Sequence, residues 1–404
     1  MALERVSFGT DRLYHGHSVA NGSGALPVAA TREHRMKERG NARDDHGEPA
    51  AASSRLSGSV TLLPLAVLLV AVCTACGLFR GAVNASPGLR WWLFSNFGAG
   101  RICPEMLKQG VGLRLSQNAP TVGRFFPTSC QHQVNEQQQT ITVQFAGTGY
   151  AWTPLAGRVG FSAEAAVEYR MDFNLTEDAT YVWANTLQIR RGPDFKLGAV
   201  ENKVANWAAA STPVGYLANL FGAQIMSSQV ASGFTVVHME EGNEFALGHL
   251  SPPQRPPRPF ATAPGDRIVY ANDTTEIRAE QVDFLGPFEV VDADQALFFR
   301  FRVQGPAVDM LLMQRGSADL WREGLQLGAL LAPPPQPPLA TWTVQAGAED
   351  RRKIPLPVGQ YSLIIDNSSR VGMTSPPWNP LSVVGAGSAT VSYTAELGAS
   401  DDSF

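Results

Sequence analysis

The chain has 404 residues, of which 44% are hydrophobic and 17% are charged, and its formal net charge is -4 at pH 7. This weakly acidic balance gives no electrostatic basis for binding nucleic acid, so we exclude that class of partner. The 38 glycines and 28 prolines, combined with low charge, favour short strands joined by turns over a helical bundle. The length allows two domains once an unpatterned front segment is set aside.

Residues 1–59 form that front segment, which mixes small, basic and acidic residues with little hydrophobic periodicity. Such composition is typical of disorder. It is also longer than the basic front of an ordinary export signal, which favours a true translation start nearer to the apolar run that follows, for instance at Met36. In either case the segment is excluded from the fold.

An apolar, uncharged run extends from Val60 to Cys76 and ends in Thr74-Ala75-Cys76, followed by Gly77. An apolar core ending in small residues predicts an export signal. The end resembles the lipobox of bacterial lipoproteins, in which a small residue precedes the cysteine that is acylated and becomes the mature N-terminus. Cys73 departs from that pattern, since leucine is usual there. The resemblance implies a lipid on Cys76 and, because glycine follows, sorting to the outer membrane of the cell envelope.

Two other interpretations of the run remain open. Residues 60–79 approach the length of about 20 apolar residues that spans a bilayer, which would make the run an uncleaved anchor. The run is also compatible with a cleaved signal that leaves no lipid. All three interpretations export the rest of the chain, and residues 77–89 then read as a flexible tether rich in small residues.

Cys103 and Cys130 are the remaining two cysteines, and we expect them to form a disulfide in an oxidising compartment. Such a bond would contribute about 3 kcal/mol in the chain-entropy description. Two free buried thiols are the alternative.

Residues 90–250 predict an α+β domain, in which an antiparallel sheet is covered by one helix. Alternation predicts strands at 140–146, 159–175 and 181–189, with a turn at 176–179, and a hairpin of residues 234–239 and 244–247. Apolar residues recur at three- and four-residue spacing within 216–232, which predicts the covering helix. The residues on its apolar face are Leu217, Leu220, Phe221 and Ile225.

A helix laid on a curved sheet can enclose a pocket for a lipid or another apolar ligand. The alternative for Leu217, Leu220, Phe221 and Ile225 is plain core packing. Arg90-Trp91-Trp92 begins this domain. We expect its tryptophans to start the core, although an exposed tryptophan near a membrane could lie in the interface.

Residues 251–264 contain a proline-rich linker, whose stiffness favours two domains held apart. Residues 265–398 predict an all-β sandwich or jelly roll, and residues 399–404 a tail. Short alternating strands are expected at 267–271, 276–284, 296–304, 308–314, 339–345, 360–366 and 388–397. The runs FFRFRV from Phe298 and LPVGQYSLIID from Leu356 resemble the β-sandwich modules of the pre-peptidase C-terminal type. That resemblance implies an accessory module without catalysis.

No nucleophile, zinc or nucleotide-binding motif is found in the folded part, and no cofactor is predicted. His238 and Glu244 flank a turn and are the best candidates for acid–base or metal chemistry, against solvated hairpin residues. Loop aspartates could bind Ca²⁺, but solvated acids are favoured; these are Asp292, Asp294, Asp309, Asp319 and Asp366. The sequence thus favours a non-enzymatic binding or scaffolding lipoprotein, with a membrane and another envelope protein or a lipid as partners. An envelope hydrolase with a scattered site is the alternative.

Overall fold

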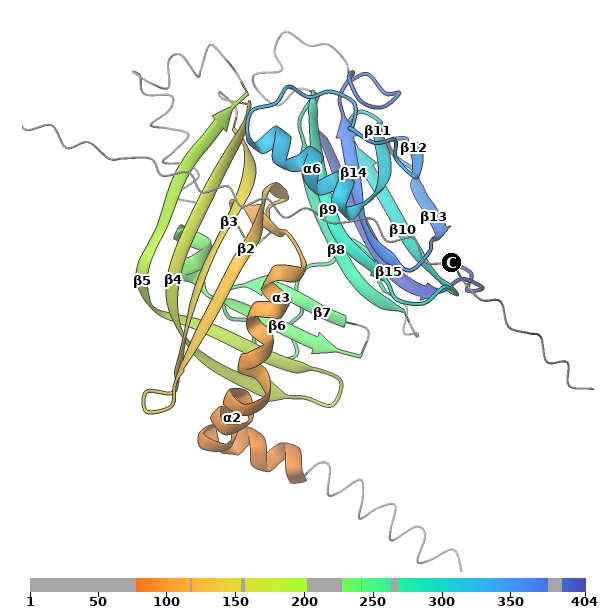
Figure 1. Cartoon of the computed structure of the whole chain (residues 1–404). Helices are drawn as coiled ribbons and strands as arrows, with labels where there is room; N and C mark the ends of the chain where they lie inside the picture. The colour runs from red at the N-terminus through yellow and green to blue at the C-terminus, as the bar shows by residue number, and fades with distance from the viewer. Residues whose placement is uncertain are drawn as a thin grey trace, which may run out of the picture. The chain divides into compact units, whose positions relative to one another are not determined.

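A computed structural model describes residues 78–116, 118–153, 157–201, 227–240, 242–262, 267–376 and 387–404. Cys76 and the four residues of the predicted ligand helix, Leu217, Leu220, Phe221 and Ile225, lie outside the described residues. The described chain is mostly β-structure with few helices, arranged as a large eleven-stranded sheet and a second sheet of four strands (Figure 1).

Helical segments open the described chain. Residues 78–85 are helical, and after them come α2 (Pro87–Leu93), the π-helix η1 (Phe94–Gly98), the 3-10 helix η2 (Ala99–Arg101) and α3 (Ile102–Lys108). The expectation of a flexible tether over residues 77–89 is therefore wrong for residues 78–89. The Ser86 hydroxyl accepts a hydrogen bond from the Leu89 amide, and Pro87 suits the first turn of α2. Val83 is fully buried, so packing stabilises this helical segment, whose composition had suggested a flexible tether.

The first part of the large sheet is antiparallel. Its strands are β1 (Val111–Arg114), β2 (Thr121–Asn135), β3 (Thr140–Thr153), β4 (Gly157–Leu175), β5 (Thr180–Val200), β6 (Phe234–Met239) and β7 (Gly242–Leu247). The predicted turn at 176–179 is confirmed, since Leu175 pairs with Thr180 across it. The predicted hairpin is confirmed as β6 and β7. Of the predicted helix at 216–232, residues 227–232 are described and are helical.

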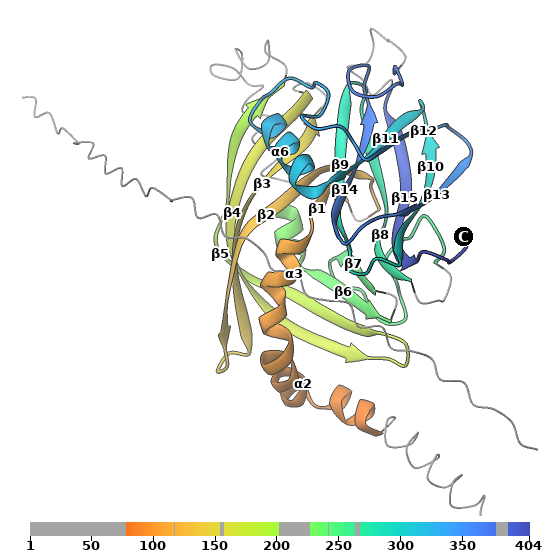
Figure 2. The same ribbon diagram turned by 45° about the vertical axis from the view of Figure 1, so that its right-hand side comes forward.

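One face of this sheet packs against the N-terminal helices (Figures 1 and 2). In β4 the odd-numbered residues from Phe161 to Phe173 are buried in that core, as strand alternation requires. Trp91 and Phe94 fill the core from the helical side. Cys103 on α3 is bonded to Cys130 on β2, which confirms the predicted disulfide.

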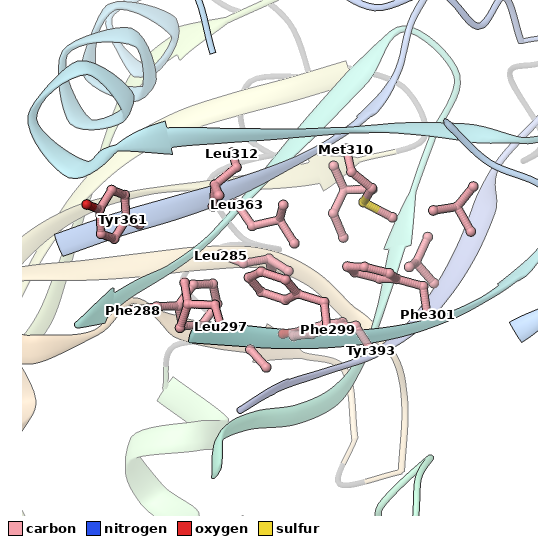
Figure 3. Close-up of a cluster of buried hydrophobic side chains, with 14 of the residues drawn as sticks. Leu285, Phe288, Leu297, Phe299, Phe301, Met310, Leu312, Tyr361, Leu363 and Tyr393 are labelled. Carbon is pink, nitrogen blue, oxygen red and sulfur yellow. The ribbon is translucent and has the colours of Figure 1, made fainter. Parts of the chain in front are cut away.

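The C-terminal strands complete both sheets. Strands β8 (Ile268–Ile277), β10 (Gln295–Gln304), β13 (Glu349–Pro355) and β15 (Ala389–Ala399) belong to the large sheet, whereas β9 (Gln281–Val290), β11 (Val308–Gln314), β12 (Ala340–Val344) and β14 (Gly359–Asn367) form the second sheet. Apolar side chains of both sheets meet between them (Figure 3), among them Phe299 and Phe301 from β10 and Leu312 and Leu363 from the second sheet.

Two expectations for this region are wrong. The strand predicted at 276–284 is interrupted at 278–280, where Glu280 has a positive φ of 63°. The chain changes sheets at that point, because Ile277 pairs with β15 and Gln281 pairs with β14. The all-β expectation fails at helix α6 (Arg315–Gln326). Its apolar residues Ala318, Trp321 and Leu325 recur at helical spacing and are buried.

The two predicted domains are not held apart. All described residues belong to one compact unit. Strand β8 forms one-residue parallel bridges with both β7 and β2. The proline-rich segment is itself tied to the sheet, because the backbone of Phe260 exchanges two hydrogen bonds with the Asn272 side chain and Arg258 forms an ion pair with Glu244 on β7. Its prolines do make the chain extended, but tertiary contacts decide its position.

Candidate functional site

A buried ion pair lies where β2 meets the second sheet. Alternation in β2 buries Phe125 in the core below the N-terminal helices and directs Arg124 to the opposite face. There Arg124 Nε lies 2.8 Å from Asp283 Oδ1, and its Nη2 lies 2.9 Å from Oδ2, which is a bidentate pairing. Both side chains are almost fully buried. The pair joins strands that are about 160 residues apart in sequence, at positions 124 and 283.

Three hydroxyl groups complete this network. Tyr150 donates to Asp283 Oδ1 at 2.7 Å, and Thr275 donates to Oδ2 at 2.9 Å. Arg124 Nη2 also donates to the Tyr393 hydroxyl at 3.2 Å. The Tyr150 oxygen in turn accepts the amide hydrogen of Phe284 at 2.9 Å. Each carboxylate oxygen of Asp283 therefore has two donors from within the protein.

The electrostatics of the network follow from this pairing. Burial alone would raise the pKa of Asp283, but the charge of Arg124 and the hydrogen bonds from Arg124, Tyr150 and Thr275 hold the pKa below its ordinary value. Burial and then the neighbouring Asp283 charge raise the pKa of Tyr150. Asp283 therefore stays ionised and Tyr150 stays neutral. The negative charge of Asp283 is balanced by the positive charge of Arg124 within the network. Arg124 on β2 and Tyr150 on β3 thereby join the first strands of the large sheet to Asp283 on β9.

Helix α6 covers a second polar group at the same interface. Its Arg322 lies with the guanidinium 3.7 Å from the centre of the Phe126 ring, and Arg158 on β4 lies 6.0 Å from the centre of the Trp152 ring. The C-terminal end of α6 can approach β4 closely because residue 160 is glycine. A Cβ at Gly160 would lie 2.1 Å from the Gln326 carbonyl oxygen.

Three side-chain donors at this place have no hydrogen-bond partner among the described residues. They are Arg158 Nη1, Arg322 Nε and Gln326 Nε2. Burial is the main reason that the pKa values of both arginines are lowered from their ordinary range. Both carboxylate oxygens of the buried ion pair thus have their hydrogen-bond donors, whereas the cluster of Arg158, Arg322 and Gln326 under α6 contains three donors without an acceptor among the described residues.

Asp309 on β11 and Asp366 on β14 form a pair of carboxylates. They lie on the face of the second sheet that is opposite to Asp283. The two residues are register partners and are fully buried. Asp309 Oδ2 accepts hydrogen bonds from the amides of Met373 and Thr374 at 2.5 and 2.6 Å, which fastens the loop after β14. Asp366 Oδ2 accepts the Gly372 amide hydrogen at 2.8 Å. Burial, reinforced by the Asp309 charge, raises the pKa of Asp366 to about 6.

The remaining predicted metal ligands are not brought to one place. Asp292 and Asp294 belong to the turn between β9 and β10, and Asp319 on α6 forms ion pairs with Arg315 and Arg322. Within the described part of the chain, no group of three or more potential ligands could hold a metal ion.

His238 and Glu244 are also separated. His238 pairs with Asn243 across the hairpin, and their side chains are 2.5 Å apart, whereas Glu244 pairs with Val237 and turns to Arg258. Successive residues of a strand point to opposite faces, so the two candidates do not converge.

A shallow depression of about 410 Å³ lies at the start of α6 and is lined by residues from 314–316 and 358–361. Arg315 and Gln360 are hydrogen bonded there at 2.7 Å. The depression is polar and open, and it is separate from the buried ion pair.

The buried ion pair was missed at the level of sequence, although a signal existed. Arg124 and Asp283 each stand as a lone charge within an apolar run, VGRFF and VDFL. A charge in a buried strand needs a partner, but the partner lies in a distant strand that periodicity does not identify.

Comparison with known proteins gives no relative: no family model matches the chain, and no curated protein is significantly similar to it. Among the described residues, no helix combines the length and the apolar character needed to cross a membrane.

Proposed function

We propose that the chain is an exported cell-envelope lipoprotein, anchored by a lipid on Cys76, that acts as a non-enzymatic binding or scaffolding protein. The observation that carries the non-enzymatic role is the Arg124–Asp283 network. Arg124 and Tyr150 bind Asp283 across the two regions of the chain, residues 90–250 and 265–398, and Thr275 completes its hydrogen bonds from within the second region. A polar centre used in this way holds the first region against the second, and each carboxylate oxygen of Asp283 already accepts two hydrogen bonds from the protein, which supports a structural role over a catalytic one.

In this proposal, residues 90–250 act as an α+β domain and residues 265–398 as a β-sandwich module. Helical residues at 87–108 and 227–232 accompany the first strands, which supports the α+β assignment. The apolar cluster between β10 and β15 on one side and β11 and β14 on the other supports the sandwich assignment (Figure 3).

The anchor is tested by replacing Cys76 with alanine in the full chain and following it by cell fractionation and incorporation of labelled fatty acid. We expect the variant to lose the label and to leave the membrane fraction. Cys73→Ala is the matched control and should keep both. Membrane retention of Cys76→Ala would favour an uncleaved anchor, and a wild-type protein that is exported without label would favour a cleaved signal.

A variant of the proposal places a lipid or another apolar ligand beside Leu217, Leu220, Phe221 and Ile225. Native mass spectrometry of the detergent-purified full chain tests it. We expect a co-purifying mass that Leu217→Asp with Phe221→Asp removes and that the exposed pair Leu327→Asp with Leu330→Asp keeps. A wild-type protein with no bound mass would contradict the ligand-binding variant and favour the scaffolding function.

The second candidate function is an envelope hydrolase, favoured by the Asp309–Asp366 pair. Adjacent carboxylates, one of which has a pKa raised to about 6, are the type of pair that serves as acid and base in hydrolysis. In this alternative, Asp366→Asn abolishes any hydrolysis detected with the purified chain. Unchanged hydrolysis in that variant would remove this pair as the site.

A further inference from the structure

The N-terminal helices expose an apolar surface at the point where the described chain begins. Four large side chains of this surface are more than half exposed: Leu78 is 74% exposed, Phe79 61%, Trp92 53% and Phe97 65%. We call these four residues the N-terminal apolar surface. Figures 1 and 2 show the helical residues 78–85 beside α2, so both contributing segments lie together.

The helices separate their apolar residues into two sets. Trp91 is buried in the first core, and its indole nitrogen donates to Glu136 at 2.6 Å, whereas its neighbour Trp92 is exposed. Trp92 and Phe97 are in edge-to-face contact, with ring centres 5.9 Å apart. They are five residues apart, and the π-helix η1, which repeats at about this spacing, brings them to one side. The exposed rings of Trp92 and Phe97 thus contact each other, whereas Trp91 packs in the core.

The charge of this segment differs from that of the whole chain. Residues 78–109 contain four basic residues and one acidic residue, a net charge of +3, whereas the chain carries -4. Arg90 is committed to Asp172 in an ion pair, and Lys108 pairs with Glu105. Arg80 directly follows Phe79 in the sequence, and Arg101 lies four residues after Phe97. Basic residues beside exposed aromatic rings suit a surface with anionic phosphate groups above an apolar layer.

The preceding sequence identifies one occupant for this surface. The uncharged apolar run ends at Cys76, two residues before Leu78. We propose that the N-terminal apolar surface lies in the headgroup interface of a phospholipid bilayer, with Trp92 and Phe97 inserted at the boundary of the acyl chains. This inference rests on the proposed membrane anchor. Because residues 78–85 and 87–89 are helical and Val83 packs into the protein, the anchor would hold the folded protein close to the membrane and not at the end of a loose tether.

The proposal is tested by tryptophan fluorescence of the full chain bound to vesicles of phosphatidylcholine and phosphatidylglycerol whose acyl chains carry bromine. Bromine quenches only those rings that reach the acyl boundary. We expect the wild-type emission to be quenched and Trp92→Phe to lose most of that quenching. Trp342→Phe, in the partly buried Trp342 of β12, is the matched control and should leave the quenched fraction unchanged.

Co-sedimentation with the vesicles separates the possible failures. If neither wild type nor Cys76→Ala sediments with vesicles, the anchor and thus the proposed function fail. If the wild type sediments but its quenching is unaffected by Trp92→Phe, the anchor stands and the present inference is overturned. Unquenched emission together with a dimer in light scattering would assign the same surface to a second copy of the chain, which also overturns it.

Discussion

The two faces of the second sheet bury aspartates in opposite electrostatic settings. Asp283 pairs in register with Ile365, and its neighbour Val282 pairs with Asp366, so the two aspartates lie on adjacent strands and point to opposite faces. Asp283 meets a cation, and its pKa is lowered despite burial. Asp366 meets a second carboxylate, and burial raises its pKa to about 6.

Burial raises the pKa of any carboxyl group, and the partners decide whether that effect is outweighed. At Asp283 the Arg124 charge and the hydrogen bonds outweigh burial, whereas at Asp366 burial prevails. A lowered pKa means that ionised Asp283 stabilises the fold above the pKa of the unfolded chain, about 3.9, and that this stability is lost as the pH falls. A raised pKa means the reverse for Asp366. Its folded state holds the proton more tightly, so stability falls as the pH rises from about 4 to about 6.

The largest expected effect comes from removing Asp283. Asp283→Ala leaves Arg124 buried without its partner, which should lower the free energy of unfolding of the full chain by about 3–5 kcal/mol. Urea denaturation measures this change. Asp350→Ala, which breaks the ion pair with Arg352 at the surface, is the control and should cost less than about 1 kcal/mol.

A double replacement sharpens the same test. Arg124→Met combined with Asp283→Leu removes both charges and should recover part of the lost stability, because apolar groups can replace a buried pair at little cost. The recovery should be incomplete, because the buried hydroxyls of Tyr150 and Thr275 lose their acceptor. Equal losses in the free energy of unfolding for Asp283→Ala and Asp350→Ala would show that the buried ion pair contributes no more to stability than a surface ion pair.

The next effect compares two consecutive leucines of β11. Leu312 is buried between the two sheets, and Leu311 is buried on the opposite face in the cluster that contains Trp321 of α6. Each replacement by alanine should cost about 2–5 kcal/mol, independently of pH. Hydrogen exchange should then separate the faces. Leu312→Ala should expose amides of β10 and β15, and Leu311→Ala those of α6 and β3. The same exchange pattern for both variants would contradict two separate clusters.

The smallest expected effect concerns Asp366. A pKa shift from about 3.8 to about 6 corresponds to at most about 3 kcal/mol of lost stability at neutral pH. Asp366→Asn keeps the acceptor for the Gly372 amide and removes the titration. The wild type should therefore lose stability between pH 4 and pH 6 relative to the variant, as measured by urea denaturation across that range. Parallel curves for the two proteins would show that Asp366 does not titrate there.

The fold was predictable where a signal is local. Alternation located β4 and β6 closely, and polar turn residues placed the β4–β5 turn correctly. Helical spacing in α6 was present in the sequence but was overlooked among short strands. The strand expected at 276–284 failed because alternation continues through the point where the chain changes sheets.

The site was predictable only in part. Cys103 and Cys130 were found because they are the two cysteines beyond the apolar run. The lone charges at Arg124 and Asp283 are visible in the sequence, but their pairing is not. His238 and Glu244 are close in sequence and yet face opposite sides of one hairpin.

The sequence by itself determined the mostly β character, the main turns and the disulfide, because strand periodicity, turn chemistry and cysteine number act over a few residues or by counting. Only the tertiary structure decided which charges meet, which tryptophan is buried and whether residues 78–89 are loose or packed. Those outcomes depend on contacts between distant segments, whose free energy comes from burial and pairing that no single segment contains.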